Sequence, residues 1–342
     1  MFSGKNSTLL LLLITCSIHL LLQITPSFAA NDPILYDIYP FIRVYRNGTI
    51  QRFIGQGFLP ASTDPRTGVQ SKDITIAKDL NISARIYLPK NANPAHKIPL
   101  LIYYHGGGFF TESAFSPNYH HHLNALVARA NVIAVSVNYR LAPENPLPIA
   151  FQDSWLALKW VFRHAGGNGG EPWLTEYADF GRVYLGGDSA GGTLAHHMAI
   201  RVGLEGSDPG VKINGMFLNC PYFWGKRLVG NENADANARK VFEALWLHAY
   251  PNTTGLDDPL VNPGMDPGLK KLGCKRVLVY VAGNDGLRFR GFYYMEVLKK
   301  SGWNGIVKVV EVQGENHVFS VIDPTTPKAI AMFKVLAFFL NQ

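Results

Sequence analysis

Residues 183–192 read VYLGGDSAGG, a short apolar run that ends in a Gly-x-Ser-x-Gly pentapeptide. Residues 183–185 predict a buried strand, and residues 191–203 predict a helix. Ser189 therefore lies in a tight strand-to-helix turn, where the flanking glycines relieve the crowding of the backbone. The free N–H groups at the start of the helix favour negative charge there. The plainer interpretation is a glycine-rich turn with a capping serine, and the other motifs of the chain decide between the two.

A cluster of three glycines follows a second buried strand. Ile98–Tyr104 is apolar on both faces, as expected of a strand in a parallel sheet, and HGGGF occupies 105–109 directly after it. Consecutive glycines let the main chain approach a substrate and direct N–H groups at a carbonyl oxygen that gains charge. The N–H of Ala190, next to Ser189, would be a further donor. A flexible linker is the alternative, but linkers rarely lie between a buried strand and aromatic residues.

A serine nucleophile also needs a base and an acid that orients the base. Asp285 follows a predicted strand at 277–282, and His317 follows another at 307–312. Both would lie at the carboxyl ends of strands, where catalytic loops occur in open α/β sheets, and the order serine, acid, histidine is the expected one. Asp257 and Asp258 compete for the role of the acid, but neither follows a predicted strand.

The rest of the chain alternates between strands and helices. Further strands are predicted at 71–77, 81–88, 132–138 and 216–220, and helices at 119–129, 151–164, 291–301 and 327–340. This alternation predicts an α/β fold with a mostly parallel sheet covered on both faces by helices. A hairpin is predicted over 41–53, with its turn at Asn47-Gly48. Residues 223–271 break the alternation and contain a short aromatic helix at 241–250, so we expect an insertion over one end of the sheet.

The composition of the 342-residue chain fits a single globular domain over 31–342 and excludes several classes of protein. Hydrophobic residues make up 47% and charged residues only 17%, which excludes a disordered chain. The formal net charge is +7, but the basic residues come singly or in pairs. That distribution indicates a solvated surface, and no nucleic-acid partner is expected.

The first thirty residues have the pattern of a targeting segment. Lys5 is the only charged residue before Asp32, residues 9–22 are almost wholly apolar, and small residues lead up to Ala30. This predicts a secretory signal peptide over 1–30, and hence a secreted or endomembrane-lumenal protein. The apolar run is shorter than the ~20 residues that span a bilayer, so no stable membrane anchor is expected. A retained signal-anchor and a transit peptide are the alternatives.

Sequons at Asn47, Asn81 and Asn252 predict N-glycosylation, which suits a secreted chain. Two cysteines remain after signal cleavage, Cys220 and Cys274, and we interpret them as buried thiols in preference to a disulfide.

Two runs of histidine, at 120–122 and 196–197, raise the question of a metal site. Adjacent histidines on a helix point in different directions, and no carboxylate-histidine zinc motif accompanies them, so no metal is predicted. No phosphate-binding loop or dinucleotide motif follows a strand, so no cofactor is expected.

Taken together, these segments resemble the plant carboxylesterase family, within the hormone-sensitive-lipase-like branch of the α/β-hydrolase fold. The resemblance covers roughly 39–342 and is carried by FIRVYRNGTIQRF at 41–53, HGGGF at 105–109, YRLAPENPLP at 139–148, GGDSAGG at 186–192 and GENHVF at 314–319. It implies a serine hydrolase with Ser189 as nucleophile, His317 as base and Asp285 as the partner of His317.

The resemblance also implies an oxyanion hole formed by Gly106, Gly107 and Ala190. It implies a cap over the pocket from about 31–60 and 223–271. The expected substrates are short-acyl or aromatic small-molecule esters, cleaved through an acyl-enzyme. The oligomeric state is left open.

Relatives that have lost hydrolysis differ from this chain at the motifs. The similar gibberellin receptors carry an aliphatic residue in place of the histidine, whereas His317 is present here. The similar dehydratases and cyclases have an altered oxyanion or nucleophile motif, whereas HGGG and GDSAGG are intact here. A lyase or cyclase, an acyltransferase and a non-catalytic receptor remain the alternatives to a hydrolase.

Overall fold

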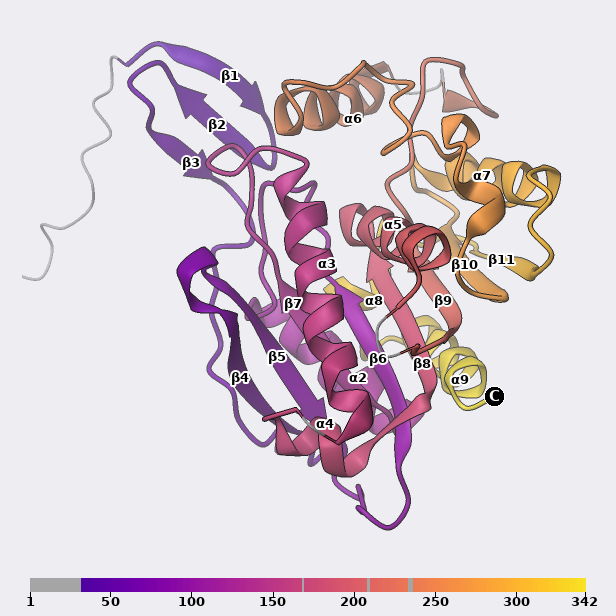
Figure 1. Ribbon diagram of the computed structural model, residues 1–342. Helices are drawn as coiled ribbons and strands as arrows, with labels where there is room; N and C mark the ends of the chain where they lie inside the picture. Colours follow the sequence, from indigo (N-terminus) through magenta and orange to yellow (C-terminus); the bar gives the residue numbers. More distant parts are fainter. Residues whose placement is uncertain (1–31, 168, 208–209, 233–235) are drawn as a thin grey trace, which may run out of the picture.

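The computed structural model describes residues 32–167, 169–207, 210–232 and 236–342. Figure 1 shows a central sheet with helices on both faces and a second, smaller sheet beside one end of it. The predicted signal peptide at 1–30 lies outside the described residues.

Eight strands form the central sheet, in the order β11-β10-β9-β8-β6-β7-β5-β4. They are β4 (Gln70–Ala77), β5 (Ile82–Leu88), β6 (Ile98–Tyr104), β7 (Ile133–Asn138), β8 (Ala178–Asp188), β9 (Ile213–Asn219), β10 (Arg276–Ala282) and β11 (Ile306–Val312). The six strands from β6 to β11 pair in parallel, and β4 and β5 pair antiparallel at one edge. The predicted mostly parallel sheet is confirmed.

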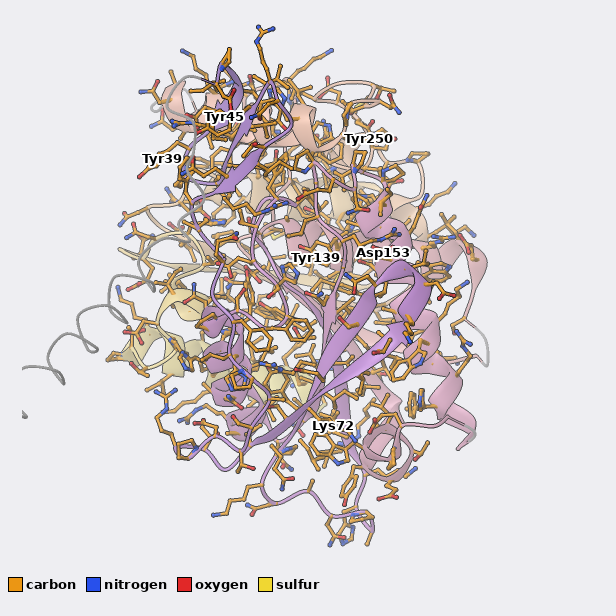
Figure 2. All side chains as sticks on the ribbon, turned by 90° about the vertical axis from the view of Figure 1, so that its left-hand side faces the viewer. Tyr39, Tyr45, Lys72, Tyr139, Asp153 and Tyr250 are labelled. Carbon is orange, nitrogen blue, oxygen red and sulfur yellow. The ribbon has the colours of Figure 1, made fainter. Side chains whose placement is uncertain are left out.

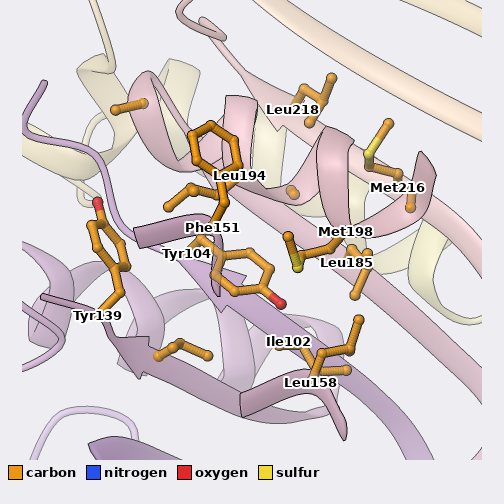
Figure 3. Packing of buried hydrophobic residues seen from close by; sticks show 14 of the residues in the cluster. Ile102, Tyr104, Tyr139, Phe151, Leu158, Leu185, Leu194, Met198, Met216 and Leu218 are labelled. Carbon is orange, nitrogen blue, oxygen red and sulfur yellow. The ribbon is translucent and has the colours of Figure 1, made fainter. Parts of the chain in front are cut away.

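The middle of the sheet is buried on both faces because strands such as β6 are apolar along their whole length. In β6, Leu100 and Ile102 point into one core while Leu101 and Tyr103 point into the other. The first core is closed by α3 (Ile149–Phe162), α5 (Ala190–Glu205) and α7 (Arg288–Lys300), and the second by α2 (Pro117–Ala130) and α9 (Pro327–Leu340). Figure 3 shows residues of β6, β8, β9 and α5 packed together in the first core.

The N-terminal segment forms a separate antiparallel sheet of three strands, β1 (Ile34–Ile38), β2 (Ile42–Tyr45) and β3 (Ile50–Arg52). Gly48 in the predicted turn has φ 88°, which a residue without a side chain adopts at little cost. The small sheet lies beside α6 (Ala236–Ala249), where the ring of Tyr36 stacks on that of His248 at 4.1 Å. In Figure 2, Tyr39, Tyr45 and Tyr250 lie at one end of the molecule and Lys72 at the other.

Several elements differ in length from their predicted ranges. The helix in the insertion begins at Ala236, and β8 begins at Ala178, earlier than the apolar pattern indicates. Polar and charged residues at these starts hide the periodicity. The short elements β1, α4 (Pro172–Tyr177), α8 (Phe319–Ile322) and the 3-10 turns η1 (Lys78–Leu80), η2 (Arg163–Gly166), η4 (Pro263–Met265) and η5 (Leu269–Lys271) were not predicted.

Cys220 and Cys274 are both buried free thiols, as predicted. Across the described residues, no helix has both the length and the apolar character needed to cross a membrane.

Candidate active site

Ser189 forms the predicted turn between β8 and α5, with φ 49° and ψ −122°. A positive φ is strained for a residue with a side chain and is found mostly at functional sites. The turn is crowded: a Cβ on Gly191 would lie 2.0 Å from the carbonyl oxygen of Tyr104, and a Cβ on Gly187 would lie 2.3 Å from that of Gly191. Packing therefore requires both glycines of the pentapeptide.

His317 and Asp285 come together as a hydrogen-bonded pair. Nδ1 of His317 lies 2.8 Å from Oδ2 of Asp285, and the other carboxylate oxygen accepts the N–H of Leu287 at 2.9 Å. Burial works against both charged forms, but the attraction between the two groups and their hydrogen bond outweigh it. The pKa of His317 is therefore raised and that of Asp285 is lowered.

Ser189, Asp285 and His317 line the same pocket, which has a volume of about 280 Å³. The other lining residues are mostly apolar or glycine: Phe41, Gly108, Tyr222, Phe242, Leu245, Asn284, Gly286 and Asn316. Phe41 precedes β2, while Phe242 and Leu245 belong to α6. Both segments expected to form a cap thus contribute to the walls of this pocket.

The glycine loop follows β6 as predicted, but one of its expected donors is already used. The N–H of Gly106 donates to the hydroxyl oxygen of Tyr119 at 2.7 Å, and that hydroxyl donates to Asp188 at 2.8 Å. An oxyanion cannot receive the same N–H, so the prediction of Gly106 as an oxyanion donor is wrong. Gly108 lies in the pocket wall instead. Three equal glycines in a row do not reveal which N–H faces Tyr119, so this could not be predicted.

Asp188 is buried and anchors the loop to the nucleophile turn. Tyr103 and Tyr119 both donate to its carboxylate at 2.8 Å. Burial raises the pKa of Asp188 to about 6, against the lowering effect of the two tyrosine hydroxyls. A Cβ on Gly106 would lie 2.5 Å from an oxygen of Asp188, so only glycine fits there.

Cys220 is a part of the site that the sequence did not reveal. Its neighbour Asn219 accepts the N–H of Ser189 at 3.0 Å, and Cys220 itself has φ 48°. A ligand atom of Cys220 lies within 4.8 Å of ligand atoms of both Asp285 and His317. Burial raises the pKa of its thiol, which keeps the sulfur protonated. A lone cysteine at the end of a strand carries no signal of such a position.

The competing acids have structural roles. Asp258 accepts hydrogen bonds from Thr253 and Thr254 in a turn of the insertion, and Asp257 accepts the N–H of Lys226. Neither is among the residues of the pocket that contains Ser189.

The three sequon asparagines, Asn47, Asn81 and Asn252, are all exposed, so their positions are compatible with the predicted glycosylation.

The two histidine runs differ in where their side chains lie. His120 faces Arg85 and Tyr87, while Nδ1 of His122 lies 3.0 Å from the carbonyl oxygen of Ser320. His196 and His197, by contrast, both have a ring nitrogen 4.0 Å from Asp266. The premise that adjacent histidines point apart is therefore wrong for this pair.

Comparisons with known proteins agree with the fold. Residues 101–321 match a family model described as an alpha/beta hydrolase fold. The chain is 47% identical over 318 residues to "Probable carboxylesterase 1" of Arabidopsis thaliana, covering 91% of this chain and 99% of the relative. It is 44% identical over 312 residues to a 2-hydroxyisoflavanone dehydratase of Glycyrrhiza echinata, covering 89% of this chain and 95% of that relative.

Among solved structures, the chain is similar to a hyperthermophilic esterase of the archaeon Pyrobaculum calidifontis. The TM-score is 0.66 at 26% sequence identity, with 80% of this chain and 85% of the other covered.

Proposed function

The chain belongs to the plant carboxylesterases, within the hormone-sensitive-lipase-like α/β-hydrolases, and is an ester-hydrolysing enzyme; from this premise we propose that it works through an acyl intermediate on Ser189. The observation that carries the proposal is the 2.8 Å hydrogen bond between His317 and Asp285 at the pocket that also contains Ser189.

His317 acts first as the general base. Because its Nδ1 faces Asp285, its Nε2 is the nitrogen left to take the proton of the Ser189 hydroxyl. Ser189 then attacks the ester carbonyl, and protonated His317 gives its proton to the departing alcohol. Water enters, loses a proton to His317 and attacks the acyl-enzyme. The bond between the acyl carbon and the Ser189 oxygen then breaks, and His317 gives its proton to that oxygen as the acid departs. Asp285 holds the imidazole and stabilises its charge.

The developing oxyanion is bound by N–H groups of Gly107, Gly108 and Ala190. Gly106 is not among the proposed oxyanion donors because its N–H donates to the hydroxyl oxygen of Tyr119. Gly107 has φ 99° and Gly108 has φ 63°, so the loop turns sharply where it meets the pocket. Ala190 is the first residue of α5, where N–H groups are free of helical partners. Together they supply preorganised donors.

The pocket supports a small substrate. Its volume of about 280 Å³ and the side chains of Phe41, Phe242 and Leu245 suit a short-acyl or aromatic ester. A neighbouring cavity of about 390 Å³ shares Phe242 and Asp285 with it and is more polar, since Arg288 lines it.

The cap consists of about 31–60 and 223–271. Arg52 at the end of β3 donates to the carbonyl oxygens of Phe110, at 2.6 Å, and Ala142, at 3.0 Å. The small sheet is thereby tied to the chain just after the glycine loop. The cap would restrict the substrate to what fits between Phe41 and α6 and would exclude water from the reacting groups.

The targeting signal supports entry into the secretory pathway, with glycosylation at Asn47, Asn81 and Asn252. Expression in plant cells should give a protein that begins near residue 30 or 31 and shifts to lower mass on treatment with an N-glycosidase. An unglycosylated protein that co-purifies with chloroplasts would instead show that the segment is a transit peptide.

The proposal is tested by turnover of p-nitrophenyl acetate and butyrate. Ser189→Ala and His317→Ala should each lose activity by several orders of magnitude, whereas His121→Ala, an exposed histidine on α2, should keep it. Equal turnover by wild type and Ser189→Ala would contradict the acyl-enzyme. A folded wild type without turnover of any tested ester would favour a receptor.

A second candidate function is elimination, and the 44% identical relative named a 2-hydroxyisoflavanone dehydratase favours it specifically. The two reactions differ in what water contributes. Hydrolysis in H₂¹⁸O places ¹⁸O in the acid product, whereas elimination forms a double bond and incorporates none. Transfer to an added alcohol would show as a new ester in place of the acid.

A further inference from the structure

Two buried histidines of α5 and one aspartate of the insertion converge on a common point, away from Ser189. Nε2 of His196 and Nδ1 of His197 each lie 4.0 Å from Oδ2 of Asp266. Ligand atoms of all three residues lie within 4.8 Å of one another. Asp266 comes directly after η4, so the cluster joins the middle of α5 to the insertion.

Each histidine has its other ring nitrogen occupied, which directs a free nitrogen at Asp266. Nε2 of His197 lies 3.0 Å from the carbonyl oxygen of Leu260, so that nitrogen carries the proton and Nδ1 presents a lone pair. Nδ1 of His196 lies 3.0 Å from the hydroxyl of Tyr294. Nε2 of His196 is fully buried and has no hydrogen-bond partner within the described part of the chain. A buried nitrogen of this kind needs an explanation.

Aromatic packing holds both rings in place and keeps them neutral. Phe223 and Tyr294 contact His196 edge-on, with ring centroids 5.4 and 5.2 Å away, and Phe151 contacts His197 at 5.3 Å. Burial lowers the pKa of both histidines, so the imidazoles are unprotonated at neutral pH. Neutral imidazole is the form that binds metals.

An ordinary hydrogen bond does not account for the cluster. At 4.0 Å, neither imidazole nitrogen is within hydrogen-bond distance of Asp266. Oδ1 of Asp266 accepts the N–H of Gly268 at 2.7 Å, which leaves Oδ2 directed at the histidines. Two imidazole nitrogens and a carboxylate oxygen thus share a site in which no hydrogen bond links the nitrogens to the carboxylate.

We propose that His196, His197 and Asp266 bind a divalent transition-metal ion, with Zn²⁺ as the best fit. Two imidazoles and one carboxylate suit zinc and are a poor set for Mg²⁺ or Ca²⁺, which prefer oxygen ligands. Zinc bonds of ~2.0–2.2 Å put tetrahedral ligand atoms roughly 3.3 Å apart. Each histidine nitrogen, now 4.0 Å from Asp266, must therefore approach the carboxylate by about 0.7 Å, and the two nitrogens, within 4.8 Å of each other, must close by at most about 1.5 Å. Leu260 and Tyr294 are the outer partners that fix ligating histidines in such sites.

The ion would have a structural role. It would connect α5, the helix that begins directly after Ser189, to the insertion that supplies Phe242 to the pocket wall. The site lies outside the proposed catalytic groups, and its existence does not depend on the proposed reaction. Met265, next to Asp266, is 55% exposed, so the cluster lies close to solvent, where a water can complete the coordination.

Calorimetric titration of tag-free, EDTA-treated protein with ZnCl₂ tests the proposal. The wild type should bind about one Zn²⁺ per chain, and its Tm should rise by roughly 5 °C at a hundredfold excess over Kd. Asp266→Asn and His197→Gln should each weaken binding by about tenfold or more. Co²⁺ in place of Zn²⁺ should give the visible absorption of a tetrahedral site, and MgCl₂ should give no binding heat.

His121→Gln, which removes an exposed histidine elsewhere, is the matched control and should bind Zn²⁺ like the wild type. The metal-free Tm and esterase turnover of each variant check that it has folded. Folded Asp266→Asn protein that binds Zn²⁺ as tightly as the wild type would overturn the proposal. So would a wild type that binds none. Neither result would bear on the reaction at Ser189, which the EDTA-treated enzyme should carry out unchanged.

Discussion

Two histidine–aspartate groups in this molecule have different surroundings and, we argue, different chemistry. At the pocket, His317 is hydrogen-bonded to Asp285 at 2.8 Å, and its side chain is 34% exposed beside a serine. In the middle of α5, His196 and His197 each have a ring nitrogen 4.0 Å from Oδ2 of Asp266, and aromatic rings pack against both imidazoles.

The difference shows why residue types alone do not define a site. A short hydrogen bond to a carboxylate raises the pKa of His317 and suits it to the proposed role of a base that accepts and returns a proton. Burial without such a bond lowers the pKa of His196 and leaves it a neutral ligand. The arrangement of His317 and Asp285 suits proton transfer. The arrangement of His196, His197 and Asp266 suits metal binding or packing alone.

The largest expected effect on kcat distinguishes the pair of His317 and Asp285 from the cluster at Asp266. Ser189→Ala or His317→Ala should lower kcat for p-nitrophenyl butyrate by about 10⁴–10⁶-fold, because each removes a group that moves in the reaction. Asp266→Asn should change kcat by less than about twofold. A comparable loss of kcat in an Asp266→Asn protein that is folded by circular dichroism would show that the two groups do not have separate roles.

Asp285→Asn should lower kcat by about 10³–10⁴-fold and also change the pH dependence. Activity is lost as the pH falls through the pKa of His317, since the protonated ring cannot take a proton from Ser189. The charge of Asp285 raises that pKa, so removing it should move the acidic limb of the residual kcat/KM profile to lower pH. A limb that stays in place would show that Asp285 does not control the base.

Tyr119→Phe should lower kcat by about tenfold, because Gly106 loses its hydrogen-bond acceptor and the glycine loop loses its attachment to Asp188. Tyr103→Phe is the matched control, since Tyr103 donates to Asp188 whereas the N–H of Gly106 donates to Tyr119. KM should change little in either variant. Equal losses of kcat in the two variants would show that the loss comes from the altered surroundings of Asp188 and not from the glycine loop.

The smallest effect concerns Cys220. Cys220→Ala should lower kcat/KM by a few-fold and shift the acidic limb of the pH profile, because a polar group near Asp285 and His317 is lost. Cys220→Ser should restore most of the activity. The buried thiol should resist iodoacetamide at neutral pH. Rapid alkylation with loss of turnover would show that the sulfur is more accessible and acidic than this account allows.

Much of the fold could be predicted because its signals are local. Unbroken apolar runs such as Ile98–Tyr104 identified the buried strands, and Pro327–Leu340 agrees residue for residue with the last helix. The placement of Asp285 and His317 also followed from the sequence, since parallel strands bring their carboxyl ends to one edge of the sheet.

What could not be predicted depends on contacts between distant parts of the chain. Tyr119 binds the N–H of Gly106, and Gly108 is the glycine that lines the pocket. The position of Cys220 depends on where β9 ends, at Asn219. The convergence of His196 and His197 depends on Asp266, which lies about seventy residues further along in an irregular segment. No spacing rule connects these residues.

Mass spectrometry after rapid acid quenching would detect the proposed covalent acyl-enzyme on Ser189. Protein mixed with p-nitrophenyl butyrate should gain the mass of one butyryl group, and peptide mapping should place it on Ser189. Ser189→Ala should gain none. Release of p-nitrophenol by the wild type with no adduct, or with an adduct on another residue, would contradict the account.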